Sequence, residues 1–297
     1  MSPRFLWAWG FAAALAATGG GAVFAMPAEV APAAAAFHLG TLKLSALRDA
    51  DNDLANDGSV FGVDVGPAAV AQVLAAAGAP TDKIALGVDA LVVQAPGRVM
   101  LFDTGLGPHV KGHLMASLAR AGLAPTQITD VFITHTHGDH VGGLATTDGH
   151  LAFPNAAIRM SAREWAWMQS QARNKAMVAL IAPRVRPFEP GDTLAPGVKA
   201  IALYGHTPGH VGYEIVSGHD RLIDIGDAAH SAVISLAKPD WAIEYDTDRK
   251  AGAVIRRALL TRVAAGHMWV FAPHFPFPGV GHVEAKGDGF VWKPGTP

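Results

Sequence analysis

Residues 134–140, with the sequence Thr-His-Thr-His-Gly-Asp-His, constrain this chain more than any other segment. They follow the apolar run 131–133, which predicts a buried strand. Three imidazoles and one carboxylate at the end of a strand supply nitrogen and hard oxygen ligands together. A histidine-rich surface turn is the alternative, but such a turn needs neither the strand before it nor the glycine pair after it. We therefore predict a metal site here.

The spacing of the ligand types within this segment indicates how they point. His135 and His137 lie two positions apart, so their side chains project from one face of an extended backbone and can bind one ion. Asp139 and His140 follow Gly138, where the chain can turn sharply. We expect these two residues to face a second ion or the other side of the first.

Three later apolar runs also end in ligand types. His206 lies in the loop Gly-His-Thr-Pro-Gly-His at 205–210, Asp227 ends the run 222–226, and His274 ends the run 269–273. Loops at the ends of strands are where α/β proteins usually build their sites. We therefore interpret the four loops as parts of one site.

Together these motifs resemble the metallo-β-lactamase superfamily of binuclear metallohydrolases, from about Phe37 to the C-terminus. The resemblance implies an α/β fold, the four-layer αββα sandwich, and two divalent metal ions, with zinc expected. It assigns His135, His137 and His206 to one ion, Asp139, His140 and His274 to the second, and Asp227 to both.

The resemblance also implies roles for residues beside the ligands. Asp103 matches an Asp that lies beneath the metal site and hydrogen-bonds the first ligand loop, and we expect His210 to be a structural hydrogen-bonding residue. His230 stands where acyl-homoserine lactonases of the superfamily have a substrate-contacting Tyr. We predict that Asp139, Asp227 and His230 act in catalysis, His230 by binding an oxyanion or protonating the leaving alcohol. A surface or helix-start position is the alternative for His230.

The C-terminal segment 273–282, Pro-His-Phe-Pro-Phe-Pro-Gly-Val-Gly-His, resembles the methyl parathion hydrolase branch of the superfamily, which is associated with phosphotriester and lactone hydrolysis. The pocket of that branch is aromatic, so the candidates to line it here are Trp165, Trp167, Phe275 and Phe277, with core packing as the alternative for each. The segment 169–188, which we expect over the site, is shorter than in that branch and leaves substrate choice open.

Two ions bridged by a carboxylate would also bridge a water and lower its pKa from 15.7 towards about 7. We therefore predict a binuclear metal-dependent hydrolase that uses a metal-bridging hydroxide to cleave an ester, a lactone or a phosphotriester of small-molecule size. The alternatives are a metallo-β-lactamase that acts on β-lactam amides and an inactive module that binds a metal or ligand.

Composition indicates which partners to expect, and the N-terminal segment indicates the cellular location. A net charge of −2, with 16% charged residues and no basic cluster, argues against a nucleic-acid partner, and zero cysteines exclude disulfides. Residues 1–25 combine Arg4, an apolar run at 5–17 and small residues before Ala25, which predicts a signal peptide cleaved near Ala25 and a periplasmic or secreted protein. The run is shorter than the ~20 residues of a membrane span, so we predict no stable span after cleavage, with an uncleaved anchor as the alternative.

The remaining pattern predicts the domain organisation. We expect a flexible Ala/Pro-rich leader at 26–36 and one hydrolase domain at 37–297, with a homodimer left open. The segments 90–103 and 214–227 share the order strand, turn, Arg, apolar strand and Asp, which predicts two similar halves packed together. Other expected elements are a strand at 37–46, a polar loop at 49–58, helices at 67–77, 110–121, 162–177 and up to 265, and a hairpin at 84–102.

Overall fold

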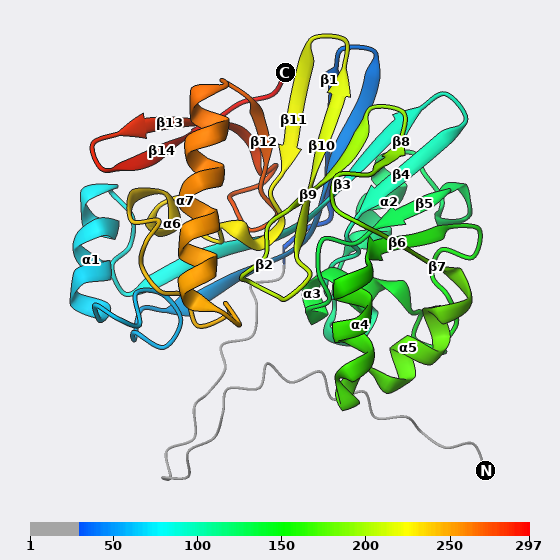
Figure 1. Cartoon of the computed structure of the whole chain (residues 1–297), viewed down its shortest axis with the longest axis horizontal. Helices are drawn as coiled ribbons and strands as arrows, with labels where there is room; N and C mark the ends of the chain where they lie inside the picture. The colour runs from blue at the N-terminus through cyan, green and yellow to red at the C-terminus, as the bar shows by residue number, and fades with distance from the viewer. Residues whose placement is uncertain (1–29) are drawn as a thin grey trace.

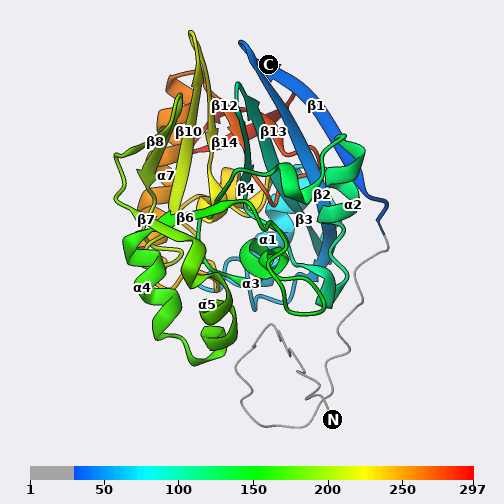
Figure 2. The ribbon, with the colours of Figure 1, turned by 90° about the vertical axis from the view of Figure 1, so that its right-hand side faces the viewer.

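The computed structural model of the chain describes residues 30–297 (Figure 1). Two seven-stranded sheets face each other, and helices cover their outer sides (Figures 1 and 2). The first sheet has the order β1 (Ala33–Leu39), β2 (Leu42–Ala55), β3 (Lys83–Ala95), β4 (Arg98–Phe102), β5 (Asp130–Phe132), β6 (Ala157–Ser161) and β7 (Val185–Phe188). The second has the order β14 (Gly289–Pro294), β13 (Val280–Lys286), β12 (Trp269–Phe271), β11 (Asp220–Asp224), β10 (Val211–Ser217), β9 (Val198–Ala202) and β8 (Thr193–Ala195). The predicted four-layer α/β sandwich is confirmed.

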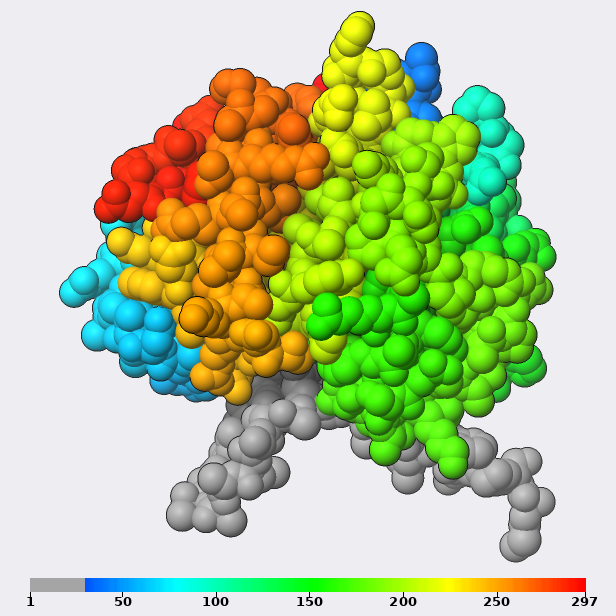
Figure 3. Space-filling model, viewed as in Figure 1, coloured from blue at the N-terminus to red at the C-terminus, as the bar shows by residue number. Residues whose placement is uncertain are grey.

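The helices divide between the two outer faces. Helices α2 (Leu114–Arg120), α3 (Gly138–Val141), α4 (Ala162–Ser170) and α5 (Lys175–Ile181) belong to the half built on the first sheet, and α1 (Pro67–Ala76), α6 (Ile234–Ala237) and α7 (Arg249–Ala265) to the other. Figure 3 shows α7 in orange and the segment around α4 in green side by side on one face of the molecule. Within residues 30–297, none of the helices combines the length and the apolar character that crossing a membrane requires.

Apolar side chains point alternately to the two faces of the strands, which is why both faces of both sheets are buried. On β3, Leu91 packs in the cluster between the sheets, and Val92 packs in the cluster under α2 and α4. On β11, Leu222 faces the space between the sheets, and Ile223 faces α7. Because successive side chains of a strand point to opposite faces, one strand serves two core layers. Each such side chain contributes about 1.5–3 kcal/mol by its burial.

The two halves repeat one arrangement, as the internal similarity predicted. The hairpin β3–β4 is followed by the parallel neighbour β5, and the hairpin β10–β11 is followed by the parallel neighbour β12. The carboxyl ends of β4 and β5 therefore lie at one edge of the first sheet, and those of β11 and β12 at one edge of the second. β9 and β11 each pair antiparallel with β10, so they run in the same direction and their carboxyl ends lie on the same side. All four ligand-bearing loops therefore follow the carboxyl ends of strands, namely β5, β9, β11 and β12.

Several local predictions were wrong because tertiary pairing outweighs local pattern. The expected strand 37–46 is a hairpin that turns at Gly40 (φ +55°), and the expected polar loop 49–58 is largely strand, since β2 pairs with β3 as far as Ala55. Ala33 to Ala36, which we expected in the leader, belong to β1. The predicted signal peptide lies outside the described residues.

The helices follow the prediction more closely. α1, the hairpin β3–β4 and the end of α7 at Ala265 are confirmed. The expected helix 162–177 is divided into α4 and α5 at Gln171, whose backbone is extended (φ −89°, ψ 113°). The expected helix 110–121 begins only at Leu114, whose N–H donates to the buried carboxylate of Asp49 at 2.7 Å.

Candidate metal centre

The predicted ligands meet where the ends of β5, β9, β11 and β12 come together. The ligand atoms form two groups, each with its members within 4.8 Å of one another. The first group is His135, His137, His206 and Asp227, and the second is Asp139, His140 and His274. Most of these side chains are buried, while His137 and Asp139 are partly exposed. The structure therefore brings together all seven predicted ligands.

Asp227 joins the two groups through its two carboxylate oxygens. Its Oδ2 lies 3.5 Å from His135 Nε2 and 3.2 Å from His206 Nε2. Its Oδ1 lies 3.2 Å from His140 Nε2 and 3.1 Å from His274 Nε2. One carboxylate thus faces both groups, as a residue shared between two cations does.

The donor atoms fit divalent cations. His140 Nε2 and Asp227 Oδ1 are buried and make no hydrogen bond of normal geometry within residues 30–297. His206 Nε2 lies 3.1 Å from His135 Nε2 and 2.9 Å from His137 Nδ1, so three ring nitrogens face one another, and a single nitrogen can donate only one hydrogen. A tetrahedral zinc with bonds of about 2.0–2.2 Å holds its ligands at a similar spacing. The donor set of imidazoles with carboxylates also suits zinc.

Asp103 hydrogen-bonds the loop that carries the first ligands. Its Oδ1 accepts from the Thr134 N–H at 2.8 Å, and its Oδ2 accepts from the Thr134 hydroxyl at 2.7 Å and contacts His140 Nδ1 at 2.8 Å. The expected hydrogen bonds to this loop are therefore present. With Nδ1 engaged, the His140 ring presents Nε2 to Asp227, which is how carboxylates orient metal-binding histidines.

His210 and Gly226 position the Asp227 loop. The Asp227 N–H donates to His210 Nε2 at 3.1 Å, and the other nitrogen of that ring lies 2.9 Å from the Leu203 carbonyl. Gly226 has φ +46°, and a Cβ there would lie 2.5 Å from His210 Nε2. Burial lowers the pKa of His210 to about 3, so the ring stays neutral and can accept. This arrangement matches the expected structural role of His210.

Glu164 hydrogen-bonds two ligand loops, a role that we did not predict. Its Oε1 accepts from the N–H and hydroxyl of Thr136 at 2.8 Å each, and its Oε2 accepts from the Thr207 hydroxyl at 2.7 Å and the Gly209 N–H at 3.0 Å. Thr136 lies between His135 and His137, so this fully buried carboxylate ties two ligand loops together. In the sequence, Ser161 and Glu164 form the Ser-x-x-Glu pattern of an ordinary helix start, so the pattern gave no signal of this role.

Asp246 was also missed, because an Asp just before the expected helix that ends at 265 resembles a helix cap. Asp248 caps α7 instead, by accepting from the Ala251 N–H at 2.9 Å. Asp246 Oδ1 lies 3.1 Å from His206 Nδ1, and its Oδ2 accepts from Arg256 at 2.6 Å. Arg256 is 1% exposed, so the pair forms a buried support that turns His206 Nε2 towards the centre.

His230 lies inside the centre rather than at the surface. Its side chain is 2% exposed, and Nε2 lies 3.1 Å from Asp227 Oδ2. The ring stacks on His274 with centroids 5.4 Å apart and an interplanar angle of 6°. His230, Asp227 and His274 also form a third group of ligand atoms within 4.8 Å. The surface alternative for His230 is therefore excluded, and its ring faces the shared carboxylate.

The four aromatic candidates for the substrate pocket lie in different surroundings. Trp167 is half-buried, and its ring meets His137 edge to face at 5.9 Å. Phe275 is fully buried against Trp292 in the core beneath α7, so its assignment to the pocket was wrong. Trp165 packs against the core on the outer side of the first sheet, and Phe277 packs against the core between the sheets and beneath Arg48.

The sequence profile of the metallo-beta-lactamase superfamily matches residues 84–274, which include every ligand described above. The chain belongs to this superfamily. The predictions of the family and of a metal-dependent hydrolase are confirmed. A relative from Xenopus laevis, metallo-beta-lactamase domain-containing protein 1, is 34% identical over 125 residues, which are 42% of this chain and 44% of the relative. The chain spans less than half the length of such curated relatives.

Solved structures of the superfamily cover more of the chain. A structure described as AidC, a dizinc quorum-quenching lactonase in complex with the product N-hexanoyl-L-homoserine, is 28% identical and superposes with a TM-score of 0.85 over 89% of this chain and 98% of that one. A second, described as hydrolase AbOPH in the beta lactamase superfamily, is 28% identical with a TM-score of 0.81 over 90% and 98%. The chain is thus similar to both over the whole sandwich.

Electrostatics in this superfamily member depend on which ring carries a proton. Burial lowers the pKa of His135 well below its usual value, and the neighbouring His140 adds to this effect. Burial also disfavours charge on His206, but Asp227 and Asp246 outweigh it and raise the pKa of His206 to about 9. Burial opposes the charge of Asp227, yet His140 and His274 hold its pKa well below the usual range. The metal-free centre therefore holds protons in place of cations.

We predict that zinc binding releases protons and tightens as pH rises. Below about pH 9 the metal-free protein keeps on His206 a proton that a bound cation must displace. The affinity should therefore rise about tenfold per pH unit for each proton displaced. Calorimetry at pH 6.5 and 8.0, in two buffers of different ionisation enthalpy, measures both quantities. A dissociation constant that is independent of pH, with no proton release, would contradict the assignment of His206 as a ligand.

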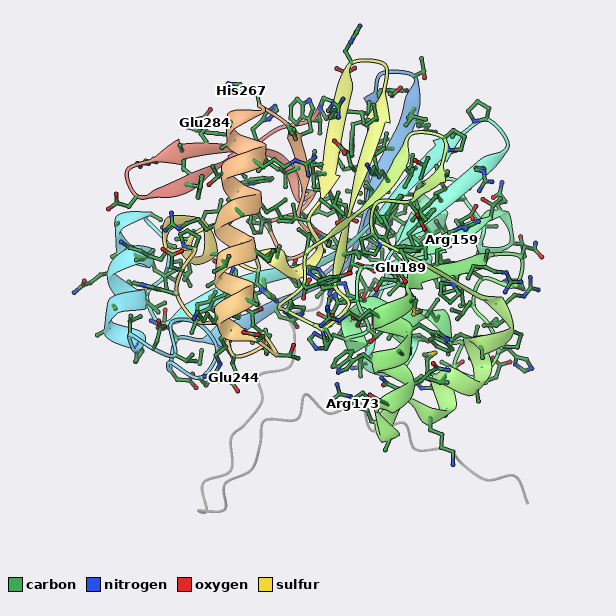
Figure 4. All side chains as sticks on the ribbon, in the orientation of Figure 1. Arg159, Arg173, Glu189, Glu244, His267 and Glu284 are labelled. Carbon is green, nitrogen blue, oxygen red and sulfur yellow. The ribbon has the colours of Figure 1, made fainter. Side chains whose placement is uncertain are left out.

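We predict that Glu164→Ala destabilises the metal-free protein by about 3 kcal/mol, because it leaves buried donors of two ligand loops without an acceptor. Zinc binding should weaken with it, since both loops carry ligands. The exposed Glu189, labelled in Figure 4, provides the control: Glu189→Ala should change the free energy of unfolding by less than about 0.5 kcal/mol. Denaturant unfolding and zinc titration test this role of Glu164, and unchanged values for Glu164→Ala would disprove it.

Proposed function

We propose that this chain is an exported, binuclear hydrolase that cleaves a lactone, an ester or a phosphotriester of a small molecule. The observation that carries the proposal is the position of Asp227, whose two oxygens each face a separate group of ligand atoms. The similarity to AidC, described as a dizinc lactonase, supports two ions and is a reason to test lactones first.

Two divalent ions, with zinc expected, would supply a water of near-neutral pKa and would polarise a carbonyl or phosphoryl oxygen. The residues of the chain then have distinct tasks. Asp227 keeps the two ligand groups at a set separation, and Asp103, Glu164 and Asp246 hold the loops that carry the histidines. No serine or cysteine nucleophile is required.

His230 and Trp167 are the proposed substrate contacts outside the ligand set. His230 Nδ1 is buried without a hydrogen-bond partner among residues 30–297, and the ring lies against the shared carboxylate. In the tautomer that carries its proton on Nδ1, the ring can donate to an oxygen that becomes negative during hydrolysis. Trp167, whose ring meets His137, offers an apolar surface for an acyl or aryl group.

Export and assembly remain proposals that rest on the sequence. The basic start, apolar run and small residues of 1–25 support a cleaved signal and a periplasmic or secreted enzyme. The near-neutral charge supports a small-molecule substrate rather than nucleic acid. We propose one hydrolase domain, and a homodimer is a further proposal. Cell fractionation with N-terminal sequencing tests cleavage near Ala25.

We predict that the purified chain binds two zinc ions and hydrolyses lactones, aryl esters or methyl parathion faster than nitrocefin, and that a chelator abolishes this activity. Asp227→Ala should lose at least one ion and lower kcat by 100-fold or more, because both ligand groups lose their shared oxygen donor. The exposed Asp220, at the start of the strand β11 that leads to Asp227, provides the matched control, and Asp220→Ala should leave both values unchanged. An Asp227→Ala variant with wild-type turnover would overturn the binuclear mechanism.

We predict that His230→Ala keeps both ions and lowers kcat/KM about tenfold or more, because the variant loses the proposed donor beside the shared carboxylate. Elemental analysis and steady-state kinetics measure the two effects, with the exposed His219→Ala as the control. A loss of one ion per chain would instead assign His230 as a ligand of the third group. Unchanged kinetics and metal content would remove His230 from the mechanism.

A further inference from the structure

Arg256 is a buried charged side chain with contacts that reach beyond Asp246. It lies on α7, and 1% of its surface is exposed. Its Nε donates to the Ala228 carbonyl at 2.8 Å, and one Nη donates to the carbonyls of Pro239 and Trp241 at 2.8 and 3.1 Å. The other Nη donates to Asp246 Oδ2 at 2.6 Å. One guanidinium in the core thus has four acceptors from three separate segments.

Backbone carbonyls fix where this guanidinium lies. The group is planar and only donates, so it cannot turn towards a new acceptor without breaking the bonds to the old ones. With Nε and one Nη engaged by carbonyls, the second Nη is left to face Asp246. Asp246 lies on a loop, and its carboxylate could otherwise rotate. Arg256 is therefore the fixed member of the pair, and Asp246 is the member that it holds.

Helix α7, drawn in orange in Figure 1, is shaped to bring Arg256 close to the His206 loop. Gly252 lies one turn before Arg256, so both residues face the same side of the helix. A Cβ at Gly252 would lie 2.5 Å from Asp246 Oδ2, and a Cβ at Gly205 would lie 2.4 Å from the Gly252 nitrogen. A glycine inside a helix is destabilising, and here it makes room for the carboxylate and for the loop.

The pairing with Arg256 decides which nitrogen of His206 can bind an ion. Next to a guanidinium, which is always charged, Asp246 remains ionised and offers only acceptor oxygens. Its Oδ1 lies 3.1 Å from His206 Nδ1, so this nitrogen must carry a hydrogen and donate it. Nε2 then faces His135 and His137 at 3.1 and 2.9 Å and can give its lone pair to a cation.

We propose that Arg256 is a positioning residue for the ion of the first group. It acts through Asp246, whose carboxylate it keeps turned so that His206 carries a hydrogen on Nδ1 and offers Nε2 to the ion. The inference rests on the proposed binuclear function and adds to it a side chain outside the ligand set. In the second group, Asp103 supports His140 instead. The effect of Arg256 is therefore confined to one of the two ions.

The substitution Asp246→Asn separates this role from general stability. Because Arg256 can only donate, it attracts the amide oxygen of the new side chain and leaves the amide nitrogen facing His206 Nδ1. His206 must then accept at Nδ1 and carry its hydrogen on Nε2, where the hydrogen blocks ligation. We expect the affinity for the ion of the first group to fall by about 10-fold to 100-fold.

A second substitution should restore part of this loss. If Arg256→Met is added to Asp246→Asn, the methionine cannot donate, and the amide is free to turn its oxygen towards His206. We expect the double variant to bind the ion of the first group about threefold or more tightly than Asp246→Asn does. Two independent structural losses would add to each other and could not produce such a recovery.

The experiment compares wild type, Asp246→Asn, the double variant and the control Arg257→Met, each as the full metal-free chain. Arg257 follows Arg256 on α7, but its side chain is 40% exposed and pairs with Asp240. Calorimetric zinc titration at a fixed pH gives an affinity for each ion, elemental analysis gives the zinc content, and circular dichroism checks the fold. We expect Arg257→Met to keep both affinities within about threefold of wild type, and the ion of the second group to be unaffected throughout.

The other outcomes also decide the role of Arg256. An unchanged affinity for the ion of the first group in Asp246→Asn would overturn the proposal, as would an equal loss of both ions. A double variant that binds no more tightly than Asp246→Asn would also overturn it. If the double variant does not fold, the selective loss of one ion in Asp246→Asn decides, because Arg256 orients that amide. If the wild type binds two zinc ions but hydrolyses no substrate, the proposed function fails, and the zinc affinities still decide the role of Arg256.

Discussion

The shared carboxylate of Asp227 is the interaction on which the rest of the site depends. Its two oxygens lie within 3.5 Å of imidazole nitrogens from loops of both halves of the sandwich. Such a cluster of buried imidazoles around one carboxylate is costly without positive charge to balance it, whether that charge comes from protons or from cations. The charge balance of the site therefore depends on the packing of the two sheets, which brings these loops together.

Buried carboxylates outside the ligand set provide the rigidity that this arrangement needs. Asp103 holds Thr134, Glu164 holds Thr136 and Thr207, and Asp246 holds His206. Burying a carboxylate is unfavourable unless hydrogen bonds satisfy it, and each of these three has at least two partners. Supporting groups of this kind orient metal ligands and thereby set metal affinity and geometry.

Sequence reasoning succeeded where a short motif carries its own chemistry. The spacing of His135, His137 and His140 predicted one metal site, and the structure brings the remaining ligands to it. It failed where the partner of a residue is distant in the chain. Glu164 and Asp246 resemble ordinary helix-capping residues locally, Phe275 resembles a pocket residue, and residues 49–55 resemble a polar loop until β3 pairs with them.

The sequence by itself determined the family, the layered α/β fold, the ligand set and the repeated hairpins of the two halves. The motifs follow from residue type and spacing, which remain the same before and after folding, and the fold and the ligand set follow from the family resemblance that those motifs carry. The tertiary structure alone decided that His230 is buried inside the centre and that Glu164 and Asp246 hold the ligand loops. Those facts depend on how two sheets pack at their edges, and contacts between residues far apart in the chain leave no local pattern in it.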